Sequence, residues 1–403
     1  MARSQKLRVG VVFGGRSGEH EVSLMSAGSI LANLDPEKYE VVPIGITKEG
    51  RWIVTGDPLR ALKEGLAAAG PCRLVALLGD PAVAGKLVEL PAGDAPPPSE
   101  AAPAEAGELS AESGPQRATG LRPAGPLPAL DVVFPVLHGP YGEDGTIQGL
   151  LELAGIPYVG AGVLGSALGM DKVAMKDVLR THGLPVLDYV LVKRSEWRAG
   201  PQAVVDRLTA ALSFPMFVKP CNLGSSVGIT KVHALGELAP AIDEAAQYDR
   251  RIIVEQGLEG AREIECSVLG NDRPEASVLG EIIPSREFYD YNAKYVDGTS
   301  GLIIPADLPA EAAEMIRDLA VRAFLALDGS GMARVDFLAS READLVYINE
   351  LNTIPGFTKI SMYPKLWEAS GLPYPALLDR LIEFALERYR DRKENLTSYQ
   401  PRD

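Results

Sequence analysis

The segment from residue 7 to residue 47 constrains the fold more than any other part of the chain. It begins with an apolar run that ends in a glycine pair, "LRVGVVFGG" (7–15), and continues with apolar side chains at helical spacing over residues 21–34. A second apolar run, "YEVVPIGIT", covers residues 39–47. A strand, a turn, a helix and a strand in this order predict an α/β domain with a parallel sheet.

The same alternation returns after residue 128. "ALDVVFPVLHG" (129–139) predicts a strand that ends in a loop, and residues 145–155 and 171–183 predict helices that stop at glycine. Residues 91–128, in contrast, contain nine Pro, nine Ala and five Gly, with no aromatic residue, Val or Ile. Because such a segment cannot bury enough apolar area to offset its ordering entropy, we expect a disordered insertion without a catalytic role.

Length, charge and cysteine spacing limit the class of protein. A chain of 403 residues predicts roughly two to three domains, and a formal net charge of −14 argues against nonspecific binding to nucleic acid or to an anionic membrane. The three cysteines are widely spaced without a CxxC motif, which indicates a reducing compartment and no structural zinc. No apolar run reaches the roughly 18 residues of a membrane helix, and the run at residues 9–13 is too short for a signal peptide. We therefore expect a cytoplasmic protein.

Two apolar runs near the C-terminus carry the clearest metal signal. "ARVDFL" (333–338) and "VYINELN" (346–352) flank the polar turn "SREAD" and predict an antiparallel hairpin. Glu350 and Asn352 lie two residues apart and so face the same way, while Asp336 interrupts the other strand. Three oxygen ligands at one end of a hairpin suit Mg²⁺, which leaves coordination sites for substrate phosphates. The alternative, a solvated strand face, is weaker for this set than it would be for a lone Asp.

A lysine followed by small residues marks a second candidate site. In "FVKPCNLGSSVGI" (217–229), Lys219 ends an apolar run, and the loop after it contains Gly224, Ser225 and Ser226. This pattern favours binding of a phosphate by backbone N–H groups, although the loop lacks the G-x-x-x-x-G-K-[ST] order of a P-loop. Lys172 in "GMDK" is a further point charge suited to phosphate, while either lysine alone is more often a surface residue.

Several carboxylates have two interpretations. Glu255 and Glu263, in and after the apolar run "RIIVEQGL", suit the amino group and the ribose hydroxyls of a nucleoside, with a structural salt bridge as the rival. In "GGRSGEHEVS", at the first strand–helix turn, Glu19 either stabilises a helix end or receives a cation such as a substrate ammonium. A dinucleotide-binding turn fails there, because Phe13 occupies the position of the first glycine of G-x-G-x-x-G.

A histidine and an aromatic segment complete the candidates. His138 ends a predicted strand in "VLHGPYGEDG", either as a satisfied loop histidine or as a hydrogen-bond donor in an active site. "FYDYNAKY" (288–295) lies in a region without periodicity, which favours a loop that covers a site over a strand edge that packs its tyrosines.

Taken together, these stretches resemble the D-alanine–D-alanine ligase family of bacterial cell-wall synthesis, whose members have an ATP-grasp fold. The matching segments occur in family order over nearly the whole chain apart from the insertion, and they are "VVFGGRSGEHEVSL", "HGPYGEDGTIQGLLELAGIPYVGAGVLGSALGMDK", "VKPCNLGSSVGITKV", "FYDYNAKY", "ARVDFL" and "INELNTIPGFTKISMYPKLWEASG". The resemblance implies an α/β, parallel-sheet N-terminal domain followed by two α+β subdomains with ATP between them. The expected boundaries are 1–161, 162–257 and 258–395, with a tail at 396–403.

The resemblance also implies a role for each residue on the nucleotide side. The phosphates of ATP would meet two lysines, a covering loop and a third lysine that approaches on closure: Lys172, Lys219, Ser225, Ser226 and Lys294. Adenine would be read by a carboxylate and the backbone that follows it, and ribose by a second carboxylate: Glu255, Gln256, Gly257, Leu258 and Glu263. Two Mg²⁺ ions would be bound by Asp336, Glu350 and Asn352, with Glu350 as the bridge. Mn²⁺ is an acceptable substitute, and the site leaves room for a monovalent cation.

On the amino-acid side, the resemblance implies that Glu19 receives the ammonium of the first D-alanine, with His138 nearby. Arg334 and the Gly356 backbone N–H would form the oxyanion site, and Ser361 would hold the carboxylate of the second substrate. Tyr295 would join Glu19 and Ser225 in a hydrogen-bonded network that links the loops.

The implied reaction converts D-alanine and ATP to an acyl phosphate, which a second D-alanine attacks to give D-alanyl-D-alanine for peptidoglycan precursors. Relatives use D-lactate or D-serine as the second substrate, and Tyr295 favours D-alanine. A noncatalytic ATP-binding regulator is the alternative of another class, but a binding module needs no oxyanion arginine such as Arg334. The resemblance further implies a homodimer whose other partners are small molecules.

Overall fold

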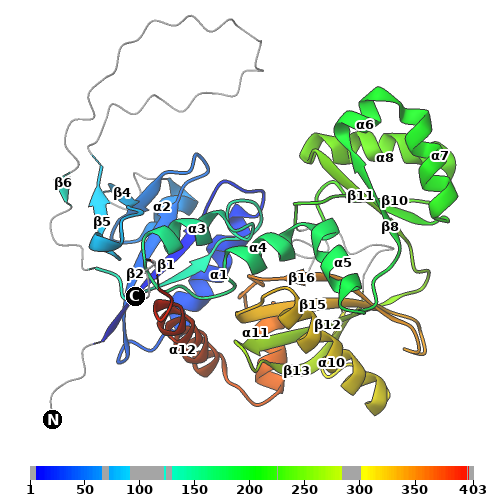
Figure 1. Cartoon of the computed structure of the whole chain (residues 1–403). Coiled ribbons are helices and arrows are strands. Elements are labelled where there is room, and N and C mark those ends of the chain that lie inside the picture. The colour runs from blue at the N-terminus through cyan, green and yellow to red at the C-terminus, as the bar shows by residue number, and fades with distance from the viewer. Residues whose placement is uncertain are drawn as a thin grey trace, which may run out of the picture.

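The computed structural model describes residues 6–65, 72–90, 122–123, 129–224, 226–283, 301–396 and 398. These residues form three sheets, each covered by helices, in three bodies that Figure 1 shows side by side. The bodies follow one another along the chain, so the colour changes from blue through green to orange as the eye moves from one to the next.

The N-terminal sheet is mixed, with a parallel core and an antiparallel extension. Its order is β6-β5-β4-β3-β2-β1-β7. β1 pairs in parallel with β2 on one side and with β7 on the other, and β3 to β6 are added as antiparallel strands. The strands are β1 (Leu7–Gly14), β2 (Tyr39–Ile46), β3 (Trp52–Val54), β4 (Arg73–Leu77), β5 (Leu87–Glu89), β6 (Arg122–Pro123) and β7 (Val132–Val136). The predicted parallel sheet is confirmed for β2, β1 and β7, and the antiparallel extension is an addition to it.

Helices cover both faces of the parallel core. Val9, Val11 and Phe13 of β1 pack in one hydrophobic cluster with α1 (His20–Asn33), whereas Val12 packs in another with α3 (Thr146–Leu153). Alternate side chains of a strand point to opposite faces, so a strand with helices on both sides is apolar throughout. The remaining helical segments of this region are α2 (Pro58–Glu64), a 3₁₀ turn at Pro81–Val83 and α4 (Val163–Met170).

The Pro- and Ala-rich segment 91–128 lies outside the described residues, except for its residues 122 and 123. These two form β6, which pairs with β5. The expectation of a disordered insertion otherwise concerns residues outside the described ones and stays a prediction.

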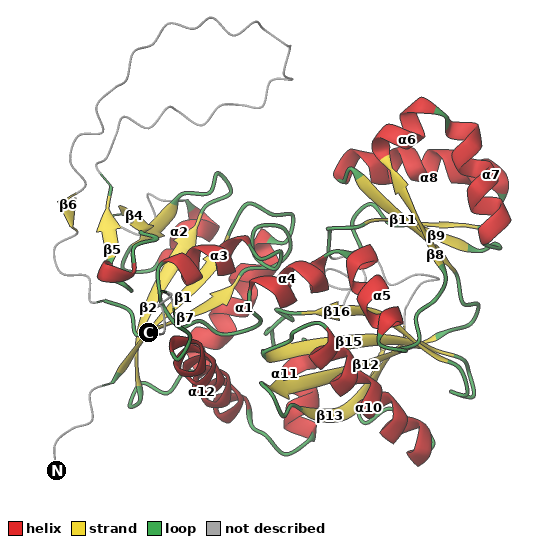
Figure 2. Ribbon diagram, in the orientation of Figure 1, coloured by secondary structure: helices red, strands yellow, loops and turns green. Residues whose placement is uncertain are grey.

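The central body is an antiparallel sheet of order β10-β9-β11-β8 with helices on one side (Figure 2). Its strands are β8 (Tyr189–Lys193), β9 (Met216–Pro220), β10 (Thr230–Val232) and β11 (Arg251–Gln256), and its helices are α6 (Arg194–Ala199), α7 (Pro201–Ala211) and α8 (Leu235–Tyr248). The helices and the sheet share a hydrophobic cluster that contains only residues between 190 and 254. This body therefore has a core of its own.

The C-terminal body is an antiparallel sheet of order β14-β13-β12-β15-β16. Its strands are β12 (Arg262–Gly270), β13 (Glu275–Ile283), β14 (Gly301–Ile303), β15 (Gly331–Ala339) and β16 (Val346–Asn352). Its helices are α5 (Lys172–Thr181), α10 (Ala310–Ala326), α11 (Met362–Ala369) and α12 (Tyr374–Lys393). The predicted hairpin is confirmed, because β15 and β16 pair antiparallel.

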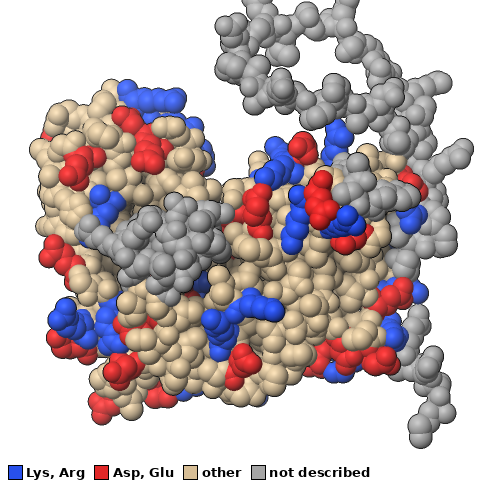
Figure 3. All heavy atoms as spheres, turned by 180° about the vertical axis from the view of Figure 1, so that it is seen from behind, with Lys and Arg blue, Asp and Glu red and all other residues tan. Residues whose placement is uncertain are grey.

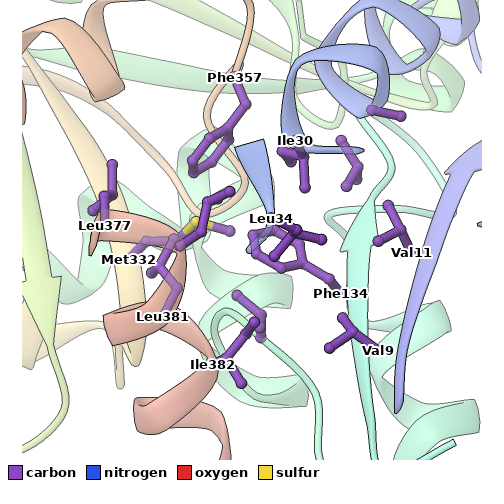
Figure 4. Close-up of a cluster of buried hydrophobic side chains, with 14 of the residues drawn as sticks. Val9, Val11, Ile30, Leu34, Phe134, Met332, Phe357, Leu377, Leu381 and Ile382 are labelled. Atoms are coloured by element: carbon purple, nitrogen blue, oxygen red, sulfur yellow. The ribbon is translucent and has the colours of Figure 1, made fainter. Parts of the chain in front are cut away.

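One hydrophobic cluster joins the N-terminal and C-terminal bodies (Figure 4). Val9 and Phe134 of the N-terminal sheet pack in the same cluster as Met332 of β15 and Leu381 of α12. Figure 4 shows Leu381 and Ile382 of α12 on the side of the helix that faces Phe134, whereas Leu377 lies farther from the strands of the first sheet. A shared core fixes these two bodies relative to each other.

The surface carries charges of both signs. Figure 3 shows Lys and Arg interspersed with Asp and Glu on one face, and a notch between the central body and the rest at the upper edge. None of the described helices is long and apolar enough to cross a bilayer. We propose domain boundaries near residues 161 and 257, which fall between the three sheets.

Candidate active site

The predicted metal ligands lie on one face of the C-terminal sheet. Asp336 of β15 is paired in register with Glu350 of β16, and Arg334 is paired with Asn352. Since residues two apart on a strand face the same way, all four side chains share one face. On the other side of β15, Glu265 of β12 is the register partner of Asp336, which brings a third carboxylate to the same face.

Arg334 is buried among these carboxylates. Its Nε and Nη2 donate to the two oxygens of Asp336, each at 2.7 Å, and its Nε lies 3.0 Å from a Glu265 oxygen. Such a two-pronged pair fixes the guanidinium plane. The predicted oxyanion group is thus held in place by one predicted metal ligand and by Glu265.

The oxygen set fits a divalent cation. Within the described residues, no three or more His, Cys, Asp or Glu form a metal-binding group, and the predicted set combines two carboxylates with one amide. Asn352 Oδ1 is buried and has no hydrogen-bond partner among the described residues, and a buried acceptor without a partner is costly unless something binds it. Carboxylate and amide oxygens are suitable ligands for Mg²⁺.

Two lysines and a carboxylate line the nucleotide side. Lys219 Nζ, at the end of β9, forms an ion pair with Glu255 of β11 and lies 3.4 Å from Asn349 Oδ1. Lys172 Nζ donates to the Leu223 carbonyl at 2.8 Å and lies 3.7 Å from Glu350. Burial raises the pKa of Glu255, but two ammonium groups outweigh burial and lower that pKa to about 2. Glu255 is therefore a carboxylate at neutral pH.

The backbone after Glu255 is partly occupied within the protein. The Gln256 N–H donates to the Asp188 carbonyl and the Gly257 N–H donates to the Pro215 carbonyl, each at 2.8 Å. Those two N–H groups are therefore engaged within the protein, and the Gly257 carbonyl accepts from Gln256 Nε2 at 3.2 Å. Ser226, Leu258 and Glu263 line the same cavity as Glu255.

Glu19 lies where two loops meet. It precedes α1 and is 8% exposed. A Cβ atom on Gly139 would fall 2.5 Å from a Glu19 oxygen, and one on Gly224 would fall 2.7 Å from the same oxygen. Only glycine allows both backbones this close to the carboxylate, and Gly139 also has a φ of 73°. The loop after β9 and the loop after β7 therefore converge on Glu19.

His138 is buried, and the protein occupies both its ring nitrogens. Nδ1 lies 2.9 Å from the Ile354 carbonyl and Nε2 lies 3.1 Å from Ser26 Oγ. The carbonyl can only accept, so these partners assign the proton to Nδ1. Burial lowers the pKa of His138 to about 4. His138 is thus a neutral link between the N-terminal domain and the loop after β16, and it lines a cavity that Arg334 also lines.

Glu143 makes a second link between the same two loops, and it was not predicted. Its carboxylate accepts from the Gly139 N–H at 2.6 Å and from the Ile354 N–H at 3.2 Å. Burial, and then the charge of Glu19, raise the pKa of Glu143 to about 8. Its position five residues after His138 in "HGPYGEDG" was the available signal.

The loop after β16 also carries Gly356 and Ser361. A Cβ atom on Gly356 would fall 2.8 Å from Ser361 Oγ, and Ser361 Oγ accepts from the Thr358 N–H at 3.0 Å. Gly356 and Ser361 therefore lie together at the wall of the cavity that also contains Arg334.

Two adjoining cavities contain most of the predicted residues. One of about 340 Å³ is lined by Glu19, His138, Arg334, Asn352, Gly356 and Ser361. The other, of about 510 Å³, is lined by Lys219, Ser226, Leu258, Glu255, Glu263 and Asp336. Both are lined by Lys172, Gly224, Glu265 and Glu350. A ligand in one cavity can thus meet a ligand in the other beside Glu350.

Three predicted site residues, Ser225, Lys294 and Tyr295, lie outside the described residues. Besides Glu143, neither Glu265 nor Lys176 was singled out from the sequence. Glu265 lies two residues after Glu263 on the same strand, and Lys176 lies one helical turn after Lys172. The spacing that places them beside predicted residues was the signal in each case.

Comparison with known proteins agrees with this arrangement. The family model "D-ala D-ala ligase N-terminus" matches residues 8–161, and "D-ala D-ala ligase C-terminus" matches residues 178–383. A D-alanine–D-alanine ligase of Natranaerobius thermophilus is 49% identical over 98% of this chain and 99% of its own, and one of Thermoanaerobacter sp. is 51% identical over 96% and 99%.

Solved structures give the same result. The structure of the D-alanine–D-alanine ligase from Coxiella burnetii covers 97% of each chain with a TM-score of 0.77 and 37% identity. The VanG D-Ala:D-Ser ligase from Enterococcus faecalis covers 94% of this chain and 100% of its own, with a TM-score of 0.77 and 35% identity. The chain therefore belongs to the D-alanine–D-alanine ligase family.

Proposed function

We propose that this protein joins two molecules of D-alanine to D-alanyl-D-alanine for peptidoglycan precursors, with conversion of ATP to ADP and phosphate. The observation that carries the proposal is the pair of cavities that meet at Lys172 and Glu350. One has a carboxylate and lysines suited to a nucleoside triphosphate. The other has a carboxylate, a guanidinium and a hydroxyl suited to two amino acids.

In the first step, a carboxylate oxygen of D-alanine attacks the γ-phosphorus of ATP. A bond forms between that oxygen and phosphorus, the bond to the β-phosphate oxygen breaks, and ADP leaves. Glu19 would hold the ammonium of this D-alanine, while Lys172 and Lys219 would hold phosphate oxygens as point charges. The reaction needs this activation because a free carboxylate is a poor electrophile.

In the second step, the amine of the other D-alanine attacks the carbonyl carbon of the acyl phosphate. The ammonium first gives up one proton; then the C–N bond forms, the C–O bond breaks and inorganic phosphate leaves, and the nitrogen loses a second proton as the amide forms. Of the two protons, one is carried by the phosphate and one passes to solvent. Negative charge develops on the carbonyl oxygen, where Arg334 and the Gly356 N–H would stabilise it. Ser361 would fix the carboxylate of the attacking amino acid. A closed site would protect the acyl phosphate from water.

Asp336, Glu350 and Asn352 are the residues that would hold magnesium; we propose that they would bind two ions and that Glu350 would be a ligand of both. When bound, the metal neutralises charge on the transferring phosphoryl group. Mn²⁺ as a substitute, a monovalent cation and a homodimeric state complete the proposal and rest on the family resemblance. The proposed cytoplasmic location rests on the cysteine spacing and the short apolar runs of the sequence.

Product analysis by mass spectrometry tests the proposal. The purified protein receives ATP, Mg²⁺ and D-alanine, with and without equimolar D-lactate or D-serine, and the Glu350→Gln variant is the control. We expect D-alanyl-D-alanine as the main product, and no product from the variant.

Other outcomes are equally informative. A mixed product with D-serine or D-lactate would keep the mechanism and overturn the choice of second substrate. If no ligated product forms together with ADP from any pair of substrates, the enzymatic proposal is overturned and a nucleotide-binding regulator is favoured.

A further inference from the structure

Lys176 is a buried charge beside the nucleotide cavity, and it has no role so far in the proposed reaction. Its side chain is 0% exposed, and it is not among the residues that line the cavity. It lies on α5, one turn after Lys172, and its Nζ is 3.1 Å from Glu255 Oε1 and 3.5 Å from the Ile348 carbonyl. Lysines are almost never fully buried unless they are paired, so this ion pair accounts for its position.

Glu255 is thus flanked by two cations that differ in their access to ligand. Lys219 pairs with Oε2 and lines the cavity, whereas Lys176 pairs with Oε1 from behind. One buried carboxylate needs one buried counter-ion, so the second ammonium is available to a ligand that brings negative charge. The phosphates of a nucleotide bring that charge, and only Lys219 faces them.

The Glu255 carboxylate retains an acceptor position. Lys176 holds Oε1 on the side away from the cavity, whereas Oε2 pairs with Lys219, which lines the cavity. Oε2 therefore becomes an open acceptor when Lys219 turns to the phosphates. An ionised carboxylate accepts hydrogen bonds and does not donate them. It therefore favours a purine with an amino group at C6 and disfavours a purine with a carbonyl there.

We propose that Lys176 is a positioning residue that keeps Glu255 ionised and oriented toward the C6 amino group of adenine while Lys219 turns to the phosphates, and that it thereby sets the preference for ATP over 6-oxopurine triphosphates. This inference rests on the proposed role of Glu255 as the group that reads the base. Lys219 is then the exchangeable partner of Glu255, and Lys176 is the permanent one.

The test compares kcat/KM for ATP with kcat/KM for inosine triphosphate, which has a carbonyl at C6. Lys176→Gln removes the charge and keeps a donor, Lys176→Arg keeps the charge, and Lys38→Met, at an exposed ion pair with Asp379, is the matched control. We expect the ATP/ITP ratio to fall by about tenfold or more in Lys176→Gln, as when a site loses a polar discriminator. Lys176→Arg should recover most of the ratio, and Lys38→Met should equal wild type. A purely structural loss would lower both values together and leave the ratio unchanged.

Two further variants keep the inference testable if Lys176→Gln does not fold. Lys219→Met should lower kcat/KM for both nucleotides and preserve their ratio, because Lys176 alone maintains Glu255. If Lys219→Met instead removes the preference for ATP over ITP, Lys219 is the counter-ion of Glu255 and the inference is overturned. If Glu255→Gln removes the preference for ATP while a folded Lys176→Gln variant keeps it, the inference about Lys176 fails. The proposed recognition of the base by Glu255 is then still supported. If Glu255→Gln preserves the ratio, the proposed role of Glu255 itself is wrong.

Discussion

At the scale of single residues, some charged groups of the site have more than one possible partner of opposite charge. Arg334 has two negative neighbours, Asp336 and Glu265, and both lie within 3.0 Å of its nitrogens. Asp336 is also a predicted metal ligand, so a bound metal and Arg334 would share its carboxylate oxygens. Glu265 remains as the carboxylate whose pairing with Arg334 does not conflict with the metal.

Glu265→Gln should therefore lower kcat by roughly tenfold, since a hydrogen bond to a charged group contributes about 1.5–3 kcal/mol and 1.36 kcal/mol corresponds to a factor of ten in rate. The KM for ATP should change less than kcat, because Arg334 lines the amino-acid cavity, although Glu265 itself lines both cavities. Steady-state kinetics measure both. The control is Glu275→Gln on β13, which removes a surface ion pair with Arg380 of α12. This variant should resemble wild type. An unchanged kcat in Glu265→Gln would mean that Asp336 alone positions Arg334.

His138 should make the protein less stable in mild acid. Its pKa is about 4 in the folded protein because of burial and about 6.5 when unfolded. The unfolded chain binds the proton more readily, so this contribution to stability is complete above pH 6.5 and is lost as the pH falls toward 4. Between pH 7 and pH 5 the loss is on the order of 2 kcal/mol.

Urea titrations at the two pH values measure this effect. His138→Gln should lose less stability than wild type over that interval, although it is less stable at pH 7 for lack of its two hydrogen bonds. Glu143 titrates in both proteins, so their difference isolates His138. His182→Gln, at the exposed C-cap position of α5, should follow wild type. Equal acid sensitivity in wild type and His138→Gln would contradict a buried neutral imidazole.

The sequence predicts these residues unevenly, for a physical reason. Glu350 and Asn352 were predicted to share a face because strand periodicity is local, and the register of the hairpin confirms it. Glu265 belongs to the site because it is the register partner of Asp336. The sequence of its own strand does not indicate this pairing. Lys176 is likewise unremarkable in a helix until β11 brings Glu255 against it.

At the scale of elements, α5 and the loop after β9 connect the bodies at the site. Val173 of α5 packs with Ile253 of the central sheet, while Met175 and Leu179 pack in the C-terminal core. The helix itself was predicted from its spacing and its glycine stop. Its contact with two different sheets was not, because helical periodicity reports how much of a surface is apolar and not which neighbours cover it.

The loop after β9 should be sensitive to a single methyl group. In Gly224→Ala the new Cβ would fall 2.7 Å from a Glu19 oxygen, so the carboxylate must move. We expect the KM for D-alanine to rise between about tenfold and a hundredfold, because small misplacements of a positioning group are costly. The melting temperature should stay close to that of wild type.

Gly236→Ala is the matched control for this experiment. Gly236 lies in α8, and a Cβ atom there would meet nothing within 4 Å. Replacement of a helical glycine by alanine stabilises by up to about 1 kcal/mol, with no expected effect on KM. A normal KM in Gly224→Ala would show that Glu19 can rearrange without loss of binding.

At the scale of the whole molecule, the sheets are stabilised by two kinds of hydrophobic cluster. One kind joins two bodies and the other lies within a single body. The N-terminal and C-terminal bodies share one cluster, to which α12 contributes Leu377, Leu381 and Ile382. The central body has a separate cluster that includes Leu208 of α7. The sequence predicted two to three domains but not this sharing, since it depends on α12 returning to the first sheet from the far end of the chain.

The two kinds of core should respond differently to loss of a buried leucine. Leu381→Ala and Leu208→Ala each remove a side chain that is 0% exposed, and each should cost about 2–5 kcal/mol in its own cluster. Hydrogen exchange followed by mass spectrometry reports local stability along the chain. Leu381→Ala should accelerate exchange in peptides of both the first sheet and the C-terminal sheet. Leu208→Ala should accelerate exchange only in peptides between residues 189 and 256. If Leu381→Ala affected the C-terminal peptides alone, the two outer bodies would be stabilised independently, and the shared cluster would be a contact and not a common core.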